Sequence, residues 1–120
     1  MLPTPQQIIG KSKEKLACQY LEDKGFKLVE KNYSCRRGEI DLIMRDRDCL
    51  VFIEVRYRNN DHFGSALESI NPPKQKRLIF TAELYLQQSR TPLASRFDVV
   101  AISGNDDNLS IIWIENAFGT

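Results

Sequence analysis

Two apolar runs separated by a short polar stretch constrain the fold of this chain more than any other feature. Residues 39–45 and 50–57 are rich in β-branched and aliphatic side chains, and the polar residues 46–48 lie between them. Runs of this length and composition form strands, and a short polar connection joins two of them into an antiparallel hairpin. The sequence therefore predicts a hairpin at the centre of the fold.

The first helix has clear start and stop signals. Thr4 is a good N-cap, and Gln7 three residues later completes a capping box. Pro5 suits the first helical position, and Gly25 is a typical left-handed stop. Apolar side chains recur at helical spacing between these signals. We therefore expect a helix over residues 5–24.

The remaining elements follow from the same kinds of pattern. Asn71-Pro72 is typical of a helix start, and an apolar stripe carries this second helix to about Gln88. We expect a loop with a helical turn over 62–70 and further strands over 26–33, 96–103 and 109–115. The order α-β-β-β-α-β-β predicts an α/β (α+β) fold, in which helices flank a mixed sheet.

Length and composition suit one domain over residues 1–120, with enough apolar content (42%) for a packed core. The net charge of +1 argues against a highly basic coating protein but leaves room for local basic patches. The sequence has no signal-peptide core and no apolar run long enough to cross a bilayer. The three cysteines lack metal-binding spacing, so we expect free thiols in a reducing cytoplasm.

The predicted hairpin brings acidic side chains together. Side chains alternate along a strand, so Glu39 and Asp41 share one face, as do Glu54 and Arg56. A tight turn near Arg47-Asp48 places Asp41 opposite or diagonal to Glu54. Opposed carboxylates repel, and a divalent cation such as Mg²⁺ or Mn²⁺ would compensate. Arg56 offers another compensation, and ordinary exposed strand carboxylates beside arginines are the alternative interpretation.

A carboxylate of the first helix is a candidate for the same site. Glu14 lies at the edge of the apolar stripe of this helix, from which it can lean over the sheet toward Asp41 and Glu54. In the alternative interpretation, Glu14 is a solvated glutamate that pairs with Lys11 or Lys13.

Basic residues gather on the second helix and around it. Between Pro72 and Arg96 the sequence has five basic residues and one acidic residue, Glu83, which suggests a phosphate-binding edge. Gln75 is expected to face the sheet edge near the metal, although a glutamine bonded to backbone and a solvated helix face are the alternatives. The candidate nucleic-acid-binding residues are Arg36, Arg37, Arg58, Lys74, Gln75, Lys76 and Arg77, with Arg90 and Arg96 also on this edge.

Three motifs together resemble a known nuclease superfamily. They are G-x-x-x-E from Gly10 to Glu14, GEIDLI over residues 38–43 and FIEVR over residues 52–56. The combination resembles the PD-(D/E)XK, or restriction-endonuclease-like, superfamily. More narrowly, the chain is similar to the small bacterial YraN-type family, which is related to archaeal Holliday-junction resolvases. RFDVV over 96–100 and NAF over 116–118 extend the resemblance to nearly the whole chain.

The resemblance implies an αβββαβ core and a metal-dependent endonuclease that hydrolyses DNA. Its implied metal ligands are Asp41, Glu54 and the backbone carbonyl of Val55, with Glu14 as the helix glutamate. The catalytic lysine of the superfamily falls on Arg56, so this chain departs from the superfamily pattern. The departure matters for catalysis, because arginine stays protonated and cannot act as a general base. Arg56 can still stabilise transition-state charge, and Lys74 is the first candidate for the missing role.

Three functions remain open at this point. The first is Mg²⁺- or Mn²⁺-dependent hydrolysis of DNA, with branched or recombination and repair intermediates as substrates. The second is a catalytically degenerate module that binds nucleic acid without cleaving it, which Arg56 favours. The third is a protein-interaction domain, which the near-zero net charge favours. The resemblance to resolvases also raises the prospect of a homodimer, and no membrane partner is expected.

Overall fold

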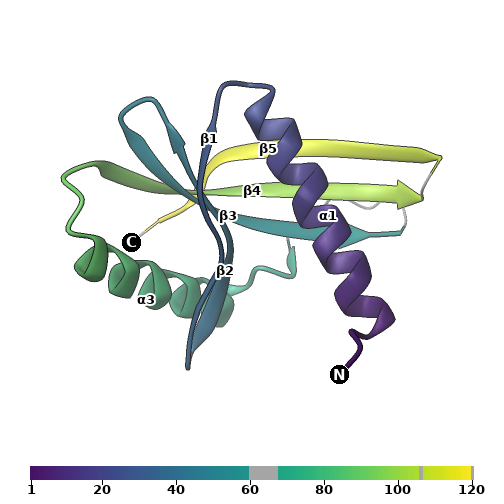
Figure 1. Ribbon diagram of the computed structural model, residues 1–120, viewed down its shortest axis with the longest axis horizontal. Coiled ribbons are helices and arrows are strands. Elements are labelled where there is room, and N and C mark those ends of the chain that lie inside the picture. The colour runs from purple at the N-terminus through teal and green to yellow at the C-terminus, as the bar shows by residue number, and fades with distance from the viewer. Residues whose placement is uncertain (60–67, 106, 120) are drawn as a thin grey trace.

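The computed structural model of the protein describes residues 1–59, 68–105 and 107–119 (Figure 1). Within these residues the helices and strands occur in the predicted order. They are α1 (Pro5–Glu22), β1 (Lys27–Cys35), β2 (Gly38–Asp46), β3 (Cys49–Arg58), α3 (Pro72–Ser89), β4 (Ala94–Asn105) and β5 (Asn108–Phe118). The expected loop, with His62 and Phe63, falls mostly outside the described residues.

Local capping interactions fix both helices where the sequence places them. The Thr4 hydroxyl accepts a hydrogen bond from the Gln7 amide (3.1 Å), and the Gln7 side chain accepts one from the Thr4 amide (2.8 Å). Gly25 has a φ of 100°, the left-handed conformation that ends the turn after α1. The Asn71 side chain accepts from the Lys74 amide (3.0 Å) at the start of α3. Neither α1 nor α3 has a stretch apolar enough to span a bilayer.

The strands form one five-stranded mixed sheet in the order β1-β2-β3-β4-β5. The pair β3–β4 is parallel, because α3 lies between these strands in the chain, and the other three pairs are antiparallel. The mixed α+β class agrees with the sequence prediction and is compatible with a restriction-endonuclease-like fold.

Among the described residues, one helix packs on each face of the sheet. Ala17 and Leu21 of α1 pack on the face that carries Val51 and Ile53, with Val100 and Ile102 of β4. Leu78 and Ala82 of α3 pack on the opposite face, against Leu50, Phe52 and Val99. Because both faces of β3 are buried, its sequence is a nearly continuous apolar run until Glu54.

The strands β2 and β3 separate at a point that we call the fork. Their pairing runs from Asp46–Cys49 at the hairpin turn to Leu42–Ile53. Beyond that pair, β3 continues beside β4 as far as Arg58, whereas β2 continues beside β1 as far as Gly38. In Figure 1, β1 and β2 swing across the sheet after this point. Asp41 and Glu54 are the next residues of the two strands, so they lie at the opening.

Candidate metal and phosphate site at the fork

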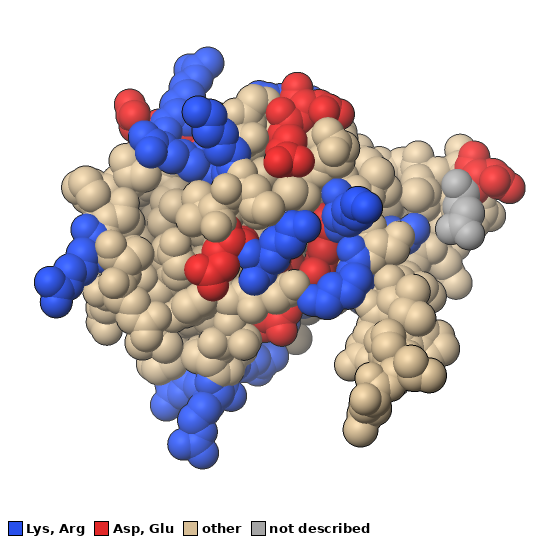
Figure 2. Space-filling model, viewed as in Figure 1, with Lys and Arg blue, Asp and Glu red and all other residues tan. Residues whose placement is uncertain are grey.

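A hollow of about 740 Å³ opens at the fork between α1, β2, β3 and the start of α3. Figure 2 shows acidic and basic side chains interleaved on this face of the molecule. We call this space the fork hollow. Its charged lining residues are Lys13, Glu14, Glu39, Asp41, Glu54, Arg56, Arg58 and Lys74, and Val55 also contributes to its wall. The structure therefore brings together all the residues that the sequence proposed as catalytic or metal-binding.

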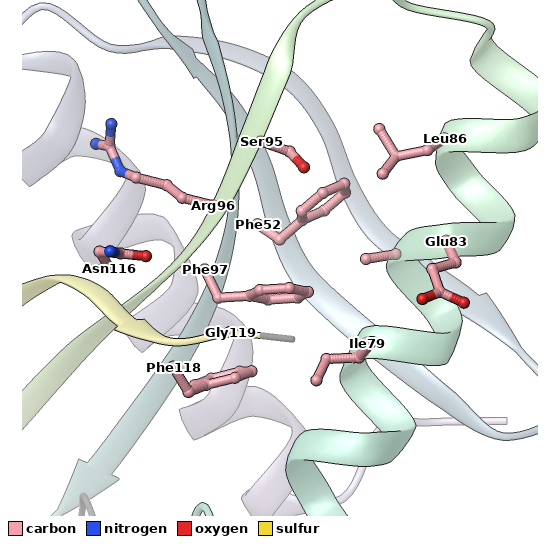
Figure 3. A pocket seen from close by; sticks show the side chains of 11 residues that line it. Phe52, Ile79, Glu83, Leu86, Ser95, Arg96, Phe97, Asn116, Phe118 and Gly119 are labelled. Carbon is pink, nitrogen blue, oxygen red and sulfur yellow. The ribbon is translucent and has the colours of Figure 1, made fainter.

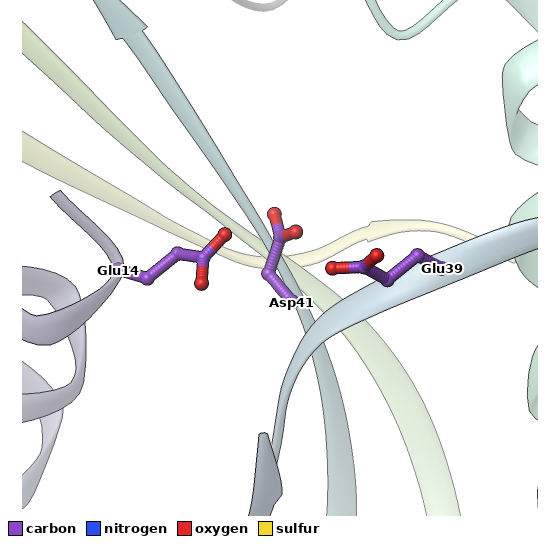
Figure 4. A group of neighbouring side chains, drawn as sticks. All are labelled: Glu14, Glu39 and Asp41. Carbon is purple, nitrogen blue, oxygen red and sulfur yellow. The ribbon is translucent and has the colours of Figure 1, made fainter. Parts of the chain in front are cut away.

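Three carboxylates converge in the fork hollow (Figure 4). One oxygen from each of Glu14, Glu39 and Asp41 lies within 4.8 Å of the other two, which defines the acidic cluster. Glu14 reaches the cluster from α1, whereas Glu39 and Asp41 belong to β2. Carboxylate oxygens at this spacing suit a hard divalent cation such as Mg²⁺ or Mn²⁺. The donor set therefore fits the expected metal.

Asn32 of β1 bridges two members of the acidic cluster. Its side-chain amide nitrogen donates to Glu14 (2.9 Å) and to Glu39 (2.9 Å), while its oxygen accepts from the Lys11 ammonium (2.6 Å). Asn32 has a φ of 52°, a left-handed conformation that asparagine tolerates better than most residues. This amide holds two carboxylates at a fixed spacing without a cation.

Asp41 lies in the acidic cluster and is half-buried. Burial raises its pKa to about 9, and the charge of Glu54 and a hydrogen bond with the Glu54 carboxyl act in the same direction. The charge of Glu14 adds a smaller upward effect, whereas the hydrogen bond from the Val55 backbone amide (2.8 Å) lowers the pKa. Without a cation, these effects together favour the protonated form of Asp41. A divalent cation would favour its ionised form.

Glu54 is 5% exposed and meets two basic side chains. Its Oε2 atom lies 2.8 Å from a terminal nitrogen of Arg56 and 3.4 Å from the ammonium of Lys74. Arg56 comes from the same face of β3, two residues along, whereas Lys74 reaches down from the first turn of α3. A buried carboxylate needs such partners. The side chains of Arg56 and Lys74 also lie beside the acidic cluster, where a phosphate could contact both cations.

Comparisons with known proteins agree with one another. The sequence model of the uncharacterised protein family UPF0102 matches residues 13–102. The chain belongs to this family. A UPF0102 protein of Nitrosococcus oceani is 48% identical over 98% of this chain and 97% of its own. Similar proteins of Nitrosomonas europaea and Vibrio parahaemolyticus are 51% and 47% identical, over 91% of this chain and 92% and 90% of their own.

Gln75, an expected site residue of this UPF0102 protein, lies outside the lining of the fork hollow. The Gln75 side chain donates to the backbone carbonyl of Ile70 (3.0 Å) and lines a separate small hollow with Ile70 and Val99. Ile70 is buried just before the cap of α3, where the helix itself provides no donor for that carbonyl. The expectation that Gln75 faces the metal is therefore wrong, and the alternative of a backbone-bonded glutamine is confirmed.

The other basic candidates divide into two groups. Arg58 and Lys74 line the fork hollow, whereas Arg36, Arg37, Lys76 and Arg77 are exposed and lie outside its lining. The Arg37 guanidinium lies 4.4 Å from the centre of the Phe80 ring, which places the β1–β2 turn beside α3. These exposed residues are available to a phosphate backbone.

Arg96 does not belong to the phosphate-binding edge that the sequence suggests. Its guanidinium binds the fully buried Asp98 (2.9 and 3.2 Å) and Asp46 (3.1 Å), and it also lies 3.5 Å from Glu115. Asp98 accepts two further bonds, from the Trp113 indole and the Asn116 amide (2.9 Å each). The expectation of a phosphate contact at Arg96 is wrong, because this network already satisfies its charge.

Sequence patterns did not single out three residues of the site. Glu39 was recognised only as sharing a face with Asp41, although alternation was the signal that could have placed it in the cluster. Asn32 gave no signal beyond its residue type. Lys13, which is 8% exposed, lines the fork hollow with its ammonium 4.7 Å from the centre of the Tyr57 ring. From the sequence, Lys13 is expected only as a surface ion-pair partner of Glu14.

A second hollow, of about 500 Å³, lies at the other end of α3. Figure 3 shows the rings of Phe52, Phe97 and Phe118 along its floor, with Ile79 and Leu86 of α3 facing them. Glu83 is the one carboxylate among the described residues that line it, so these residues provide no converging carboxylates. The fork hollow is therefore the better candidate for metal-assisted chemistry.

Proposed function

We propose that this protein is a metal-dependent endonuclease of the PD-(D/E)XK kind that hydrolyses phosphodiester bonds in DNA. The observation that carries the proposal is the convergence of Glu14, Glu39, Asp41 and Glu54 at the fork, with Arg56 and Lys74 beside them. Carboxylates that hold a cation, next to cations that bind phosphate, are the combination that phosphodiester hydrolysis needs. The resemblance of the GEIDLI and FIEVR motifs to that superfamily supports the same reaction.

The residues of the fork divide the chemistry between them. Asp41 and the acidic cluster would hold Mg²⁺ or Mn²⁺, which lowers the pKa of a water and neutralises charge on the leaving oxygen. Arg56 offers a planar guanidinium that can grip a phosphate through two hydrogen bonds. Arg56 cannot accept a proton. Lys74 reaches the same carboxylate from α3, so it is the residue positioned to take the role of the superfamily lysine.

The second candidate function is a nucleic-acid-binding module without catalysis. It is favoured by the pairing of Glu54 with Arg56 and Lys74, and by the raised pKa of Asp41, because both reduce the negative charge of the site without a metal. Such a module would bind phosphates through the basic residues alone, with a strong salt dependence.

Incubation with branched, duplex and single-stranded DNA distinguishes the two functions. We expect cleavage of at least one substrate with Mg²⁺ or Mn²⁺ and none with chelator. Asp41→Asn should abolish cleavage, whereas Asp48→Asn, which changes an exposed carboxylate at the hairpin turn, should not. Metal-independent binding without cleavage in every condition would reject the nuclease and support the module.

A further inference from the structure

A smaller hollow of mixed apolar and polar lining adjoins the fork hollow along α1. It measures about 350 Å³ and is lined by Ile8, Ile9, Ser12, Lys13, Tyr57 and Asn105. Ile9, Lys13 and Tyr57 line the fork hollow as well, so the two hollows are adjacent. Ile8 and Ile9 remain 56% and 46% exposed, and Ile9 also lines the charged fork hollow. Exposed apolar side chains grouped at the edge of a polar site mark a binding surface.

We propose that this hollow binds one unpaired nucleobase of the strand whose phosphate lies at the fork. The inference rests on the proposed function and specifies its substrate class. Ile8 and Ile9 offer apolar surface for a planar ring, and Tyr57 also lines the hollow, where its hydroxyl donates to the Gly104 carbonyl (2.9 Å). The hydroxyl of Ser12 and the amide of Asn105 can meet the polar edge of a base.

The size and charge of the hollow favour a single base over larger occupants. Ligand hollows span roughly 300–1,000 Å³, so this space is at the small end. Lys13 lines both hollows, so its ammonium can contact the backbone phosphate between the bound base and the reacting group. A base stacked inside a duplex cannot enter a side pocket. The substrate is therefore a strand with an unpaired base beside the cleaved bond, as in a single strand, a flap or a frayed junction.

Binding of labelled oligonucleotides, followed by fluorescence anisotropy in chelator, tests this inference without relying on cleavage. We expect the wild-type protein to bind a short single strand more tightly than the blunt duplex of the same sequence. Removing one base at successive positions should weaken binding by roughly tenfold at one position, the scale of one base contact. Ile9→Ala should abolish most of that difference. Ile112→Ala, which removes a similarly exposed isoleucine (41%) on β5, should leave it unchanged.

The possible results separate this inference from the proposed function. Metal-dependent cleavage of duplex and single strand at equal rates, with no position sensitive to base removal, would overturn the base pocket and leave the nuclease intact. Absence of both DNA binding and cleavage would overturn both. If Ile9→Ala instead converts a dimer into a monomer in sedimentation and base removal has no effect, a second copy of the chain occupies the hollow and the inference is wrong.

Discussion

Replacing Asp41 by asparagine tests the electrostatics of the fork directly. The pKa of Asp41 is about 9 in the folded protein without metal, because the carboxyl is buried beside Glu54, against 3.8 for the free side chain. Between these two values the folded state holds one proton more than the unfolded state. The free energy of unfolding must therefore fall as the pH rises through this window, and the loss is complete above about pH 9.

The asparagine variant should remove this loss and retain the geometry. Its side-chain oxygen can accept from the Val55 amide as Asp41 does (2.8 Å), and its NH₂ group can donate to Glu54 as a protonated carboxyl does. One proton corresponds to about 1.4 kcal/mol per pH unit. We therefore expect the stability advantage of Asp41→Asn over wild type to grow by about 1.4 kcal/mol per pH unit between about pH 5 and pH 8.

Urea unfolding in chelator, followed by the fluorescence of the single tryptophan, Trp113, measures this difference. Asp48→Asn is the matched control, because its side chain is 98% exposed and the same substitution there should leave the pH profile unchanged. Addition of Mg²⁺ should stabilise the wild type by mass action and have little effect on Asp41→Asn. Parallel pH profiles for wild type and Asp41→Asn in chelator would refute the reasoning, since Asp41 would then be ionised in the folded state.

Four further perturbations have definite expected outcomes. Asn32→Gly keeps the left-handed backbone and removes the amide, so calorimetry should detect weaker Mg²⁺ binding; equal affinity would mean that the bridge is not needed. Asp98→Asn should lower the free energy of unfolding by about 3–5 kcal/mol, because it leaves Arg96 without its main partner, and should not change DNA affinity. Arg56→Ala should reduce turnover by about a hundredfold, whereas Arg56→Lys should retain or raise it; cleavage by Arg56→Ala at the wild-type rate would reject the role. A flatter salt dependence of DNA binding is expected for the triple alanine variant of Lys74, Lys76 and Arg77, and an unchanged slope would show that α3 faces away from DNA.

Local signals explain why most of the fold could be predicted. The capping box at Thr4 and the asparagine cap at Asn71 act within a few residues, so they fix the helix starts regardless of the rest of the chain. The predicted ends of the strands are less accurate. The strand β5 continues to Phe118, three residues beyond the expected end at Glu115. Its end is set by pairing with β4 across an irregularity between Phe97 and Val99, which is a long-range effect.

The fork could be predicted only in part. Alternation and a tight turn were enough to bring Asp41 near Glu54, because both facts depend on a single hairpin. The separation of β2 from β3 was not predictable, because it depends on how β2 continues along β1 and β3 along β4. Asn32 enters the site through this β1–β2 pairing, between the pairs Lys31–Leu42 and Tyr33–Ile40, so that it lies beside Asp41.

Two arginines illustrate why spacing alone cannot separate a functional ion pair from a structural one. Arg56 follows Glu54 by two residues, and Arg96 precedes Asp98 by two, so each pair shares one face of a strand. Around Arg96 the bonding is complete, since Asp98 is fully buried and accepts from a guanidinium, an indole and a backbone amide. Around Arg56 it is incomplete, because its buried Nε finds no partner among the described residues. An unmet buried donor costs about 1–3 kcal/mol, so the ion pair at Arg56 is the less completely satisfied of the two, and the partly exposed side chain of Arg56 is the part that an anion could reach.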